Sequence, residues 1–316
     1  MQTPNDACDE LICLIGPTAS GKSTIAIEIA NRLPVEIVSV DSALIYKSMD
    51  IGTAKPRAQI RTRIPHHLID IIEPNEYYSA AQFTKDALSA VAQIRHRRHI
   101  PLLVGGTMFY FNVLANGLSP MPETHLKTRA ELVARYKTTE KLYKKLQSID
   151  PATAMRIHPN DRQRVLRALS VYSESKRTMS YYQTKQSKTA TTATHYIALD
   201  FDNRATMHRR IEQRLNNMLR CGLLDEVATL MLRGDLDANS TSMRAIAYRQ
   251  VWQYLIGNYG FSEMVQTALA ASRQFAKRQL TWMRRMPIIA RYAVDAMSSD
   301  NIAKQIIDDT SLGKYL

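Results

Sequence analysis

The chain has 316 residues, 45% of them hydrophobic, which is enough to bury the core of one large domain or two smaller ones. No run of 18 apolar residues occurs, so a membrane span is not expected, and the polar, acidic first ten residues are unlike a secretory signal. The cysteines, Cys8, Cys13 and Cys221, have no metal-binding spacing and form no plausible disulfide framework, which favours a reducing cytoplasm.

Positive charge is the second global feature. The formal net charge is +13, and it is unevenly distributed along the chain. Residues 121–200 contain 15 basic and 7 acidic residues, and residues 264–294 contain six basic residues and no acidic one. Such concentration favours a polyanionic partner, nucleic acid above all, over a merely solvated surface.

The first chemical motif is a phosphate-binding loop, with the sequence Gly16-Pro17-Thr18-Ala19-Ser20-Gly21-Lys22-Ser23. An apolar run at 11–15 predicts a buried strand before it, and the spacing of Ile25, Ile29 and Leu33 predicts a helix after it, over 24–33. Strand, turn and helix together direct backbone N–H groups at an anion. The Lys22 ammonium would contact the distal phosphates and the Ser23 hydroxyl would hold Mg²⁺. The loop therefore predicts a polyphosphate ligand, and alone it is typical of a protein that binds ATP or another nucleotide.

Further strands and helices alternate after this loop. A strand at 35–40 ends at Asp41, a helix over 79–98 begins at Ser79, and a strand at 100–104 ends at Gly105-Gly106-Thr107. This alternation predicts a parallel, doubly wound sheet with ligands at the carboxyl ends of its strands, so Asp41 and Thr107 should border the phosphate loop. From its position alone, Asp41 could be a metal-site carboxylate, a general base or the cap of the next turn.

A helical segment interrupts this pattern. The proline-rich stretch at 118–122 marks a break, and residues 123–185 show helical patterns, including a helix capped by Asp161 that runs to Glu174. A polar loop at 184–194 precedes a strand at 196–199. We therefore expect a P-loop NTPase-like α/β core from 1–119 and 196–316, with an all-helical insertion domain at 120–195.

The C-terminal part of the core is predicted to be mainly helical. One helix spans 204–220, is capped by Asp202 or Asn203 and ends at Gly222. A second spans 263–285 and places three basic side chains on one face, which favours phosphate tracking over a solvated face: Arg273, Lys277 and Arg284. Trp282 on this helix could stack on a base or pack in the core. The adjacent His66 and His67 would face opposite ways on a strand, which favours a structural role over a metal pair.

Several strings together resemble the bacterial tRNA dimethylallyltransferases, also called tRNA isopentenyltransferases. Besides the loop at 16–22, they are Val-Asp-Ser-Ala-Leu-Ile-Tyr at 40–46, Asp-Ile-Gly-Thr-Ala-Lys-Pro at 50–56, Leu-Val-Gly-Gly-Thr at 103–107, Ile-His-Pro-Asn-Asp at 157–161 and Lys-Arg-Gln-Leu-Thr-Trp at 277–282. The resemblance spans nearly the whole chain, in order. It implies transfer of a dimethylallyl group from dimethylallyl diphosphate to the exocyclic amine of the adenine 3′ of the tRNA anticodon, with Mg²⁺ as cofactor.

The resemblance also implies roles for individual residues. Asp41 matches the family's base, Thr107 a group near the bridging oxygen and the nucleophile, and Lys22 a cation that neutralises the diphosphate held by residues 16–23. It implies contacts with the tRNA anticodon stem-loop from Asp41, Ser42, Ala43, Leu44, Thr107, Arg129, Gln163, Arg164, Val165, Leu166, Arg167, Arg244, Ala245, Ile246, Ala247, Tyr248, Arg249, Lys277, Arg278, Gln279, Leu280, Thr281, Trp282, Met283 and Arg284. We expect a cytoplasmic monomer.

Three other functions are compatible with a phosphate-binding loop. An adenylate dimethylallyltransferase would prenylate a free nucleotide, but it would not need a long basic insertion. A nucleotide kinase would phosphorylate its substrate with ATP and place arginines over the phosphates. An RNA-binding protein with a vestigial loop would bind tRNA without turnover.

Overall fold

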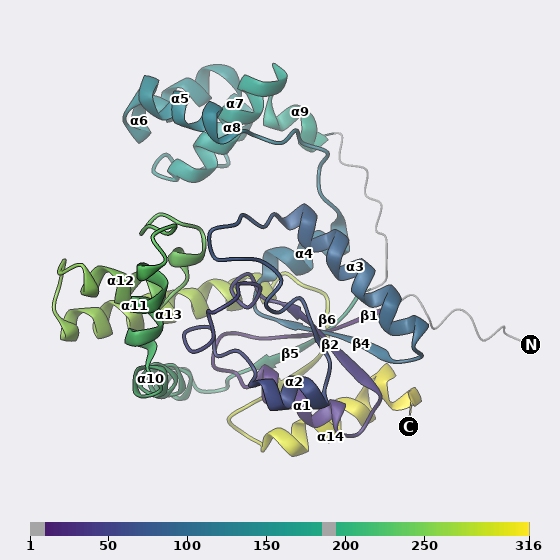
Figure 1. Ribbon diagram of the computed structural model, residues 1–316. Coiled ribbons are helices and arrows are strands. Elements are labelled where there is room, and N and C mark those ends of the chain that lie inside the picture. The colour runs from purple at the N-terminus through teal and green to yellow at the C-terminus, as the bar shows by residue number, and fades with distance from the viewer. Residues whose placement is uncertain (1–9, 185–193, 316) are drawn as a thin grey trace, which may run out of the picture. The chain divides into compact units, whose positions relative to one another are not determined.

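The computed structural model describes residues 10–184 and 194–315. Its described strands form one sheet with the order β3-β2-β4-β1-β5-β6, and every pairing is parallel (Figure 1). The strands are β1 Leu11–Ile15, β2 Val35–Val40, β3 His66–His67, β4 Ile100–Gly105, β5 Thr194–Asp200 and β6 Ile288–Ala293. A parallel sheet flanked by helices confirms the predicted α/β class.

The described helices divide between the sheet and a separate helical unit. They are α1 Lys22–Ala30, α2 Ala58–Arg63, α3 Ala80–His96, α4 Met108–Asn116, α5 Leu126–Tyr136, α6 Thr139–Ile149, α7 Pro151–Ala154, α8 Arg162–Ser175, α9 Met179–Thr184, α10 Arg204–Arg220, α11 Leu223–Leu232, α12 Tyr248–Leu255, α13 Phe261–Met283 and α14 Ser299–Asp309, with short 3₁₀ turns at Ser242–Arg244 and Ser311–Tyr315.

Both faces of the sheet are covered, which is why its central strands are almost entirely apolar. Alternate residues of β1 point to opposite faces: Leu11, Cys13 and Ile15 pack with residues of α3, α4 and α10–α13, whereas Ile12 and Leu14 pack with α1 and α14. Burial raises the pKa of the Cys13 thiol, as expected for an inert core cysteine.

The helix signals in the sequence were largely correct. Ser79 and Asp161 cap α3 and α8 with their side chains, and Asn203, rather than Asp202, accepts a backbone hydrogen bond at the start of α10. The helix after the phosphate loop begins at Lys22, two residues before the predicted start at Thr24. It ends at Ala30, three residues before the predicted end at Leu33. The predicted loop at 184–194 falls mostly on residues 185–193, which lie outside the described part of the chain.

Two strands have no clear sequence signal. β6 is an edge strand whose side chains alternate between partly buried and exposed, and it contains Arg291. β3 has only two residues, His66 and His67. His66 Nδ1 lies 2.7 Å from the Ile64 carbonyl and His67 Nε2 lies 2.7 Å from the buried Glu36 carboxylate. Within residues 10–184 and 194–315, no group of three potential metal-binding side chains occurs.

The chain contains two compact units. Residues 10–115 and 194–315 form the unit with the sheet, and residues 116–184 form a second unit of helices α5–α9. The second unit has its own apolar core, which includes Leu142, Leu146, Val165, Leu169 and Val171. No helix in the described ranges is both long enough and apolar enough to cross a membrane.

Candidate active site

The phosphate-binding loop joins β1 to α1 and leaves the start of that helix open to an anion. Gly21 has φ 79° and Ala19 has φ 64°, a left-handed conformation that glycine adopts without strain. No side chain caps α1. Because the first N–H groups of a helix have no partner within the helix, they can donate hydrogen bonds to an anion bound in the loop.

Lys22 lies across this loop. Its Nζ donates to the carbonyl oxygens of Gly16 and Pro17 at 2.9 and 2.8 Å. Burial, helped by the neighbouring positive charge of Arg214 and opposed by Asp41, lowers the pKa of Lys22 to about 7. The lysine is thus held in the loop with its charge only partly compensated, which favours binding of a negatively charged group.

Gln279 of α13 connects the phosphate loop to the end of β4. Its Oε1 accepts from the Thr18 N–H at 2.8 Å, and its Nε2 donates to the Gly106 carbonyl at 2.8 Å. The side chain is only 3% exposed. A Cβ at Gly106 would lie 2.3 Å from Gln279 Nε2, so this close approach requires glycine. In this structure Gln279 therefore contacts the phosphate-binding loop and the end of β4.

Asp41 and Thr107 follow β2 and β4 and lie at the same edge of the sheet. Asp41 Oδ1 accepts from the Ala43 N–H at 2.8 Å, so this carboxylate caps the next turn with one oxygen. The Thr107 hydroxyl oxygen accepts from the Ser42 N–H at 3.1 Å. Asp41 also raises the pKa of Lys22, which places its charge beside the phosphate loop. The three groups that the resemblance identifies as catalytic are thus brought together by strand ends.

Arg214 is a site residue that we did not predict from the sequence. It lies on α10, its Nη2 donates to the Thr53 carbonyl at 3.1 Å, and burial lowers its pKa while Asp41 opposes that shift. Arg214 follows Met207 by seven residues and Ile211 by three, so it falls on the apolar face of its helix. An arginine among the apolar positions of a helix indicates a buried charge, and this pattern could have identified Arg214 from the sequence.

Glu226 of α11 holds the segment that follows the Asp41 turn. Its carboxylate accepts backbone N–H bonds from Asp50, Ile51 and Gly52 at 2.9, 2.7 and 3.1 Å. The Tyr248 hydroxyl donates to the same carboxylate at 2.5 Å. Tyr248 is fully buried and its ring packs against the Gly52 backbone.

Lys55 closes the same segment from its other end. The Lys55 ammonium is buried and donates to the Tyr46 carbonyl at 2.9 Å and to the carboxylates of Asp50 and Asp70. Residues 41–55 are therefore fixed at several points from α10, α11 and their own side chains.

The tRNA-binding residues proposed in the sheet-bearing unit fall into three groups by their exposure. The side chains of Ala247, Tyr248, Gln279 and Met283 are buried, those of Ala43, Leu44, Thr107, Ala245, Ile246 and Leu280 are partly exposed, and those of Ser42, Arg244, Arg249, Lys277, Arg278, Thr281, Trp282 and Arg284 are exposed. Trp282, which from the sequence could either stack on a base or pack in the core, is 39% exposed. The exposed group includes five positive charges carried by α12, α13 and the adjoining 3₁₀ turn.

The remaining proposed tRNA-binding residues belong to the helical unit. Val165 and Leu166 are in its core, Arg129 is partly buried and Gln163 is exposed. Arg164 forms an ion pair with Asp161 at 3.4 Å. Arg167 donates to the Thr124 hydroxyl and the Pro122 carbonyl at 2.8 and 3.3 Å. Both arginines therefore have local partners as well as solvent access.

The donor set beside the loop fits Mg²⁺. Ser23 presents an exposed hydroxyl on the first turn of α1, and Asp41 is the carboxylate whose charge acts on the neighbouring Lys22. Hydroxyl and carboxylate oxygens are ligands that Mg²⁺ prefers, and the ion keeps several waters and phosphate oxygens in such sites.

Comparison with known proteins places this geometry in a family. The family model for IPP transferase matches residues 44–286, about three quarters of the chain. A tRNA dimethylallyltransferase of Halorhodospira halophila is 48% identical over 288 residues, covering 90% of this chain and 93% of the relative. The chain belongs to the IPP transferase family. The resemblance found in the sequence motifs is thereby confirmed.

Solved structures agree with this assignment. The tRNA isopentenylpyrophosphate transferase of Bacillus halodurans is 34% identical with a TM-score of 0.71, and 97% of each chain is covered. The enzyme of the same name from Staphylococcus epidermidis is 34% identical with a TM-score of 0.70, covering 97% of this chain and 99% of the other. A eukaryotic dimethylallyltransferase acting on tRNA, 23% identical, shares the fold with a TM-score of 0.80 over 98% of this chain and 80% of its own.

The Gln279 bridge leads to a first prediction. Gln279→Ala leaves the Thr18 N–H and the Gly106 carbonyl without their partner, which should cost ~1–3 kcal/mol of unfolding free energy. We also expect about tenfold weaker binding of inorganic diphosphate, because the loop loses its anchor. Gln274→Ala, an exposed glutamine on the same helix, is the control and should change neither quantity. Urea denaturation and calorimetric titration measure both, and wild-type diphosphate affinity in Gln279→Ala would contradict the role of the bridge.

Lys22 leads to a second prediction, about pH. Since its pKa is lowered to about 7, Lys22 is largely neutral at pH 8, and a bound anion raises its pKa and recharges it. Binding of diphosphate at pH 8 should therefore take up protons that Lys22→Met does not take up, and wild-type affinity should fall as the pH rises above 7. Calorimetry in buffers of different ionisation enthalpy measures this uptake. Equal proton uptake in wild type and Lys22→Met would show that Lys22 is already charged.

Proposed function

We propose that the chain transfers the dimethylallyl group of dimethylallyl diphosphate to the exocyclic amine of the adenine just 3′ of the anticodon in tRNA. The observation that carries this proposal is the junction of a phosphate-binding loop with Asp41 and Thr107 at one edge of the sheet, in a chain of the IPP transferase family. The 48% identical relative is named for the same reaction.

The loop would hold the leaving group. As the bond between the allylic carbon and the bridging oxygen breaks, its electron pair moves to the diphosphate, and positive charge develops on the carbon. The open N–H groups of α1, the Lys22 ammonium and the nearby Arg214 stabilise that departing oxygen more in the transition state than before it. Mg²⁺, held through Ser23 and the phosphate oxygens, would neutralise further negative charge when bound.

The other half of the reaction forms a bond from the amine nitrogen to the allylic carbon. This nitrogen is a weak nucleophile because its lone pair is delocalised into the purine ring. As the bond forms, the nitrogen releases a proton, and the Asp41 oxygen not used in the turn would accept it. Thr107, bonded to the neighbouring Ser42 backbone, would orient the reacting groups. The adenine must leave the loop stack to reach these residues.

Three groups of residues would hold the tRNA: the Asp41–Leu44 turn, the exposed basic side chains of α12 and α13, and the Arg129 and Gln163–Arg167 positions of the helical unit. Phosphate contacts of this kind supply affinity that decreases with salt. The high net charge and its concentration in these segments support a nucleic-acid substrate over a free nucleotide. We further propose that the enzyme acts as a monomer in the cytoplasm.

Which molecule receives the dimethylallyl group is tested with a radioactive label on that group. The protein is incubated with Mg²⁺, radiolabelled dimethylallyl diphosphate and either undermodified tRNA, AMP or ATP. We expect label on tRNA alone, at the adenine 3′ of the anticodon. Label on AMP but not on tRNA would show an adenylate dimethylallyltransferase, and phosphorylation by ATP without prenyl transfer would show a kinase.

Asp41 provides the mechanistic test. Asp41→Asn keeps the shape of the side chain but cannot accept the amine proton, so single-turnover transfer should fall by ~10²–10⁴-fold while diphosphate affinity changes little. Asp308→Asn, the same change at an exposed carboxylate on α14, is the control and should retain the chemical step. Rapid-quench measurement of transfer checks this, and an unchanged single-turnover rate in Asp41→Asn would exclude Asp41 as the base.

A further inference from the structure

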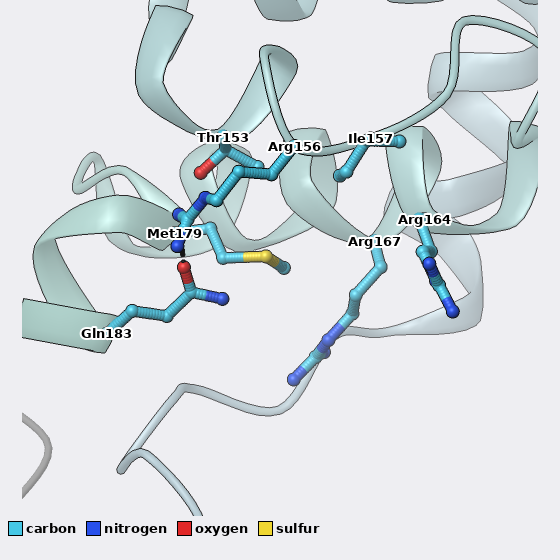
Figure 2. Close-up of a pocket in the computed structure, with 7 residues that line it drawn as sticks. All are labelled: Thr153, Arg156, Ile157, Arg164, Arg167, Met179 and Gln183. Carbon is cyan, nitrogen blue, oxygen red and sulfur yellow. Dashed lines mark hydrogen bonds between the residues drawn. The ribbon is translucent and has the colours of Figure 1, made fainter. Parts of the chain in front are cut away.

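The helical unit contains a cavity of about 220 Å³ between α7, α8 and α9 (Figure 2). Its walls combine apolar and positively charged side chains. Ile157 and Met179, each nearly buried, form the apolar part. Arg156, Arg164 and Arg167 supply three guanidinium groups, and no acidic residue lines the cavity. Its size is below the ~300–1,000 Å³ of drug-sized ligand sites, so it suits a single flat ring system rather than a whole nucleotide.

The polar groups of the cavity are held in place by the fold. The Arg156 guanidinium donates to the Gln183 amide oxygen and, through Nε, to the Ala152 carbonyl at 3.2 Å. Figure 2 shows the Arg156 side chain, which follows α7, meeting the Gln183 side chain of α9. A guanidinium fixed in its own plane leaves its two faces available for stacking, and the Gln183 NH₂ group can still donate to a ring edge.

Thr153 adds a buried polar atom. It is 2% exposed and lines the cavity, and its Oγ1 makes no hydrogen bond with any residue of the described ranges. Burial raises the pKa of the nearby Asp150 carboxyl, but its hydrogen bonds with Thr153 and Ser180, including one from the Thr153 N–H at 3.1 Å, lower that pKa below its ordinary value. Since a buried hydroxyl without a partner is costly, this atom is suited to meet a polar edge of a ligand.

We propose that this cavity receives one unstacked nucleobase of the substrate's anticodon loop, other than the adenine that is modified. The inference rests on the proposed function, because it takes RNA as the substrate. The base would lie between Ile157 and Met179 and stack on the Arg156 guanidinium, with its polar edge toward Thr153 and Gln183. Arg164 and Arg167, the arginines on α8, would contact the phosphates on either side of it. Single-stranded bases are recognised in proteins by this combination of stacking and edge hydrogen bonds.

Base-by-base removal in the RNA tests the proposal. Anticodon stem-loops that each lack one loop base are titrated against the full-length protein by fluorescence anisotropy. Wild type should show one position, distinct from the modified adenine, where loss of the base weakens binding roughly 10- to 100-fold. Prenyl transfer to the intact stem-loop is measured first. Absence of both transfer and binding contradicts the proposed function itself, whereas transfer without any such position contradicts only the cavity proposal.

Three variants test whether that position binds in the cavity. Met179→Trp fills the cavity and should bind the intact stem-loop as weakly as wild type binds the abasic one, with no further loss on the abasic RNA. Met155→Trp makes the same change at another methionine of the helical unit, one whose side chain is 88% exposed, and should behave as wild type. Thr153→Val, which keeps the shape of the side chain, should lose part of the preference between bases at that position.

The outcomes are decisive in both directions. Loss of sensitivity to the abasic position in Met179→Trp, with an unchanged melting temperature, supports the cavity as the base site. If Met179→Trp keeps the wild-type abasic profile, the base binds elsewhere and the proposal is wrong. If Arg156→Ala weakens intact and abasic stem-loops equally, the arginine contacts only phosphate, which also overturns it. Should Met179→Trp fail to fold, the base preference of Thr153→Val decides: a reduced preference between bases at that position supports the proposal, and an unchanged preference overturns it.

Discussion

The side-chain amide of Gln279 is the interaction on which the rest of the site depends. It joins the phosphate loop at Thr18 to the end of β4 at Gly106, across 261 and 173 residues of sequence. The opposite face of the same helix carries Lys277, Arg278 and Arg284 in the solvent. One helix therefore contacts the phosphate-binding loop with its buried face and presents basic side chains with its exposed face, so the surfaces proposed for the two substrates keep a fixed geometry.

Charge balance explains why this loop suits a leaving group. Lys22 and Arg214 bring two positive charges to the loop, and Asp41 supplies one negative charge that raises the pKa of both. In the free protein, this excess of positive charge is reduced because the lowered pKa of Lys22 lets it lose its proton more easily, and not because a second carboxylate balances it. An arriving diphosphate completes the balance, and it does so most fully when the carbon–oxygen bond breaks and the bridging oxygen gains charge.

The sequence was informative wherever the signal was local. The phosphate loop, the strand ends at Asp41 and Thr107, and the caps Ser79, Asp161 and Asn203 all depend on neighbours within a few residues, and the structure has them as predicted. Arg214, Glu226 and the bridging role of Gln279 depend on contacts between segments 160 or more residues apart. β3 and β6 are strands only because a neighbouring strand offers them hydrogen bonds.

Every contact that fixes the catalytic geometry lies within one compact unit. The Asp41–Lys55 segment is tied to α10 through Arg214 and to α11 through Glu226, and Gln279 ties the phosphate loop to α13. None of these bonds involves the helical unit, which is stabilised by its own apolar core. The donors and acceptors proposed for the reaction are therefore already held in place in the protein without RNA. It follows that substitutions in the helical unit should change which RNA is bound. Substitutions of the residues that make these bonds, Arg214, Glu226 and Gln279, should instead change how fast the bound RNA reacts.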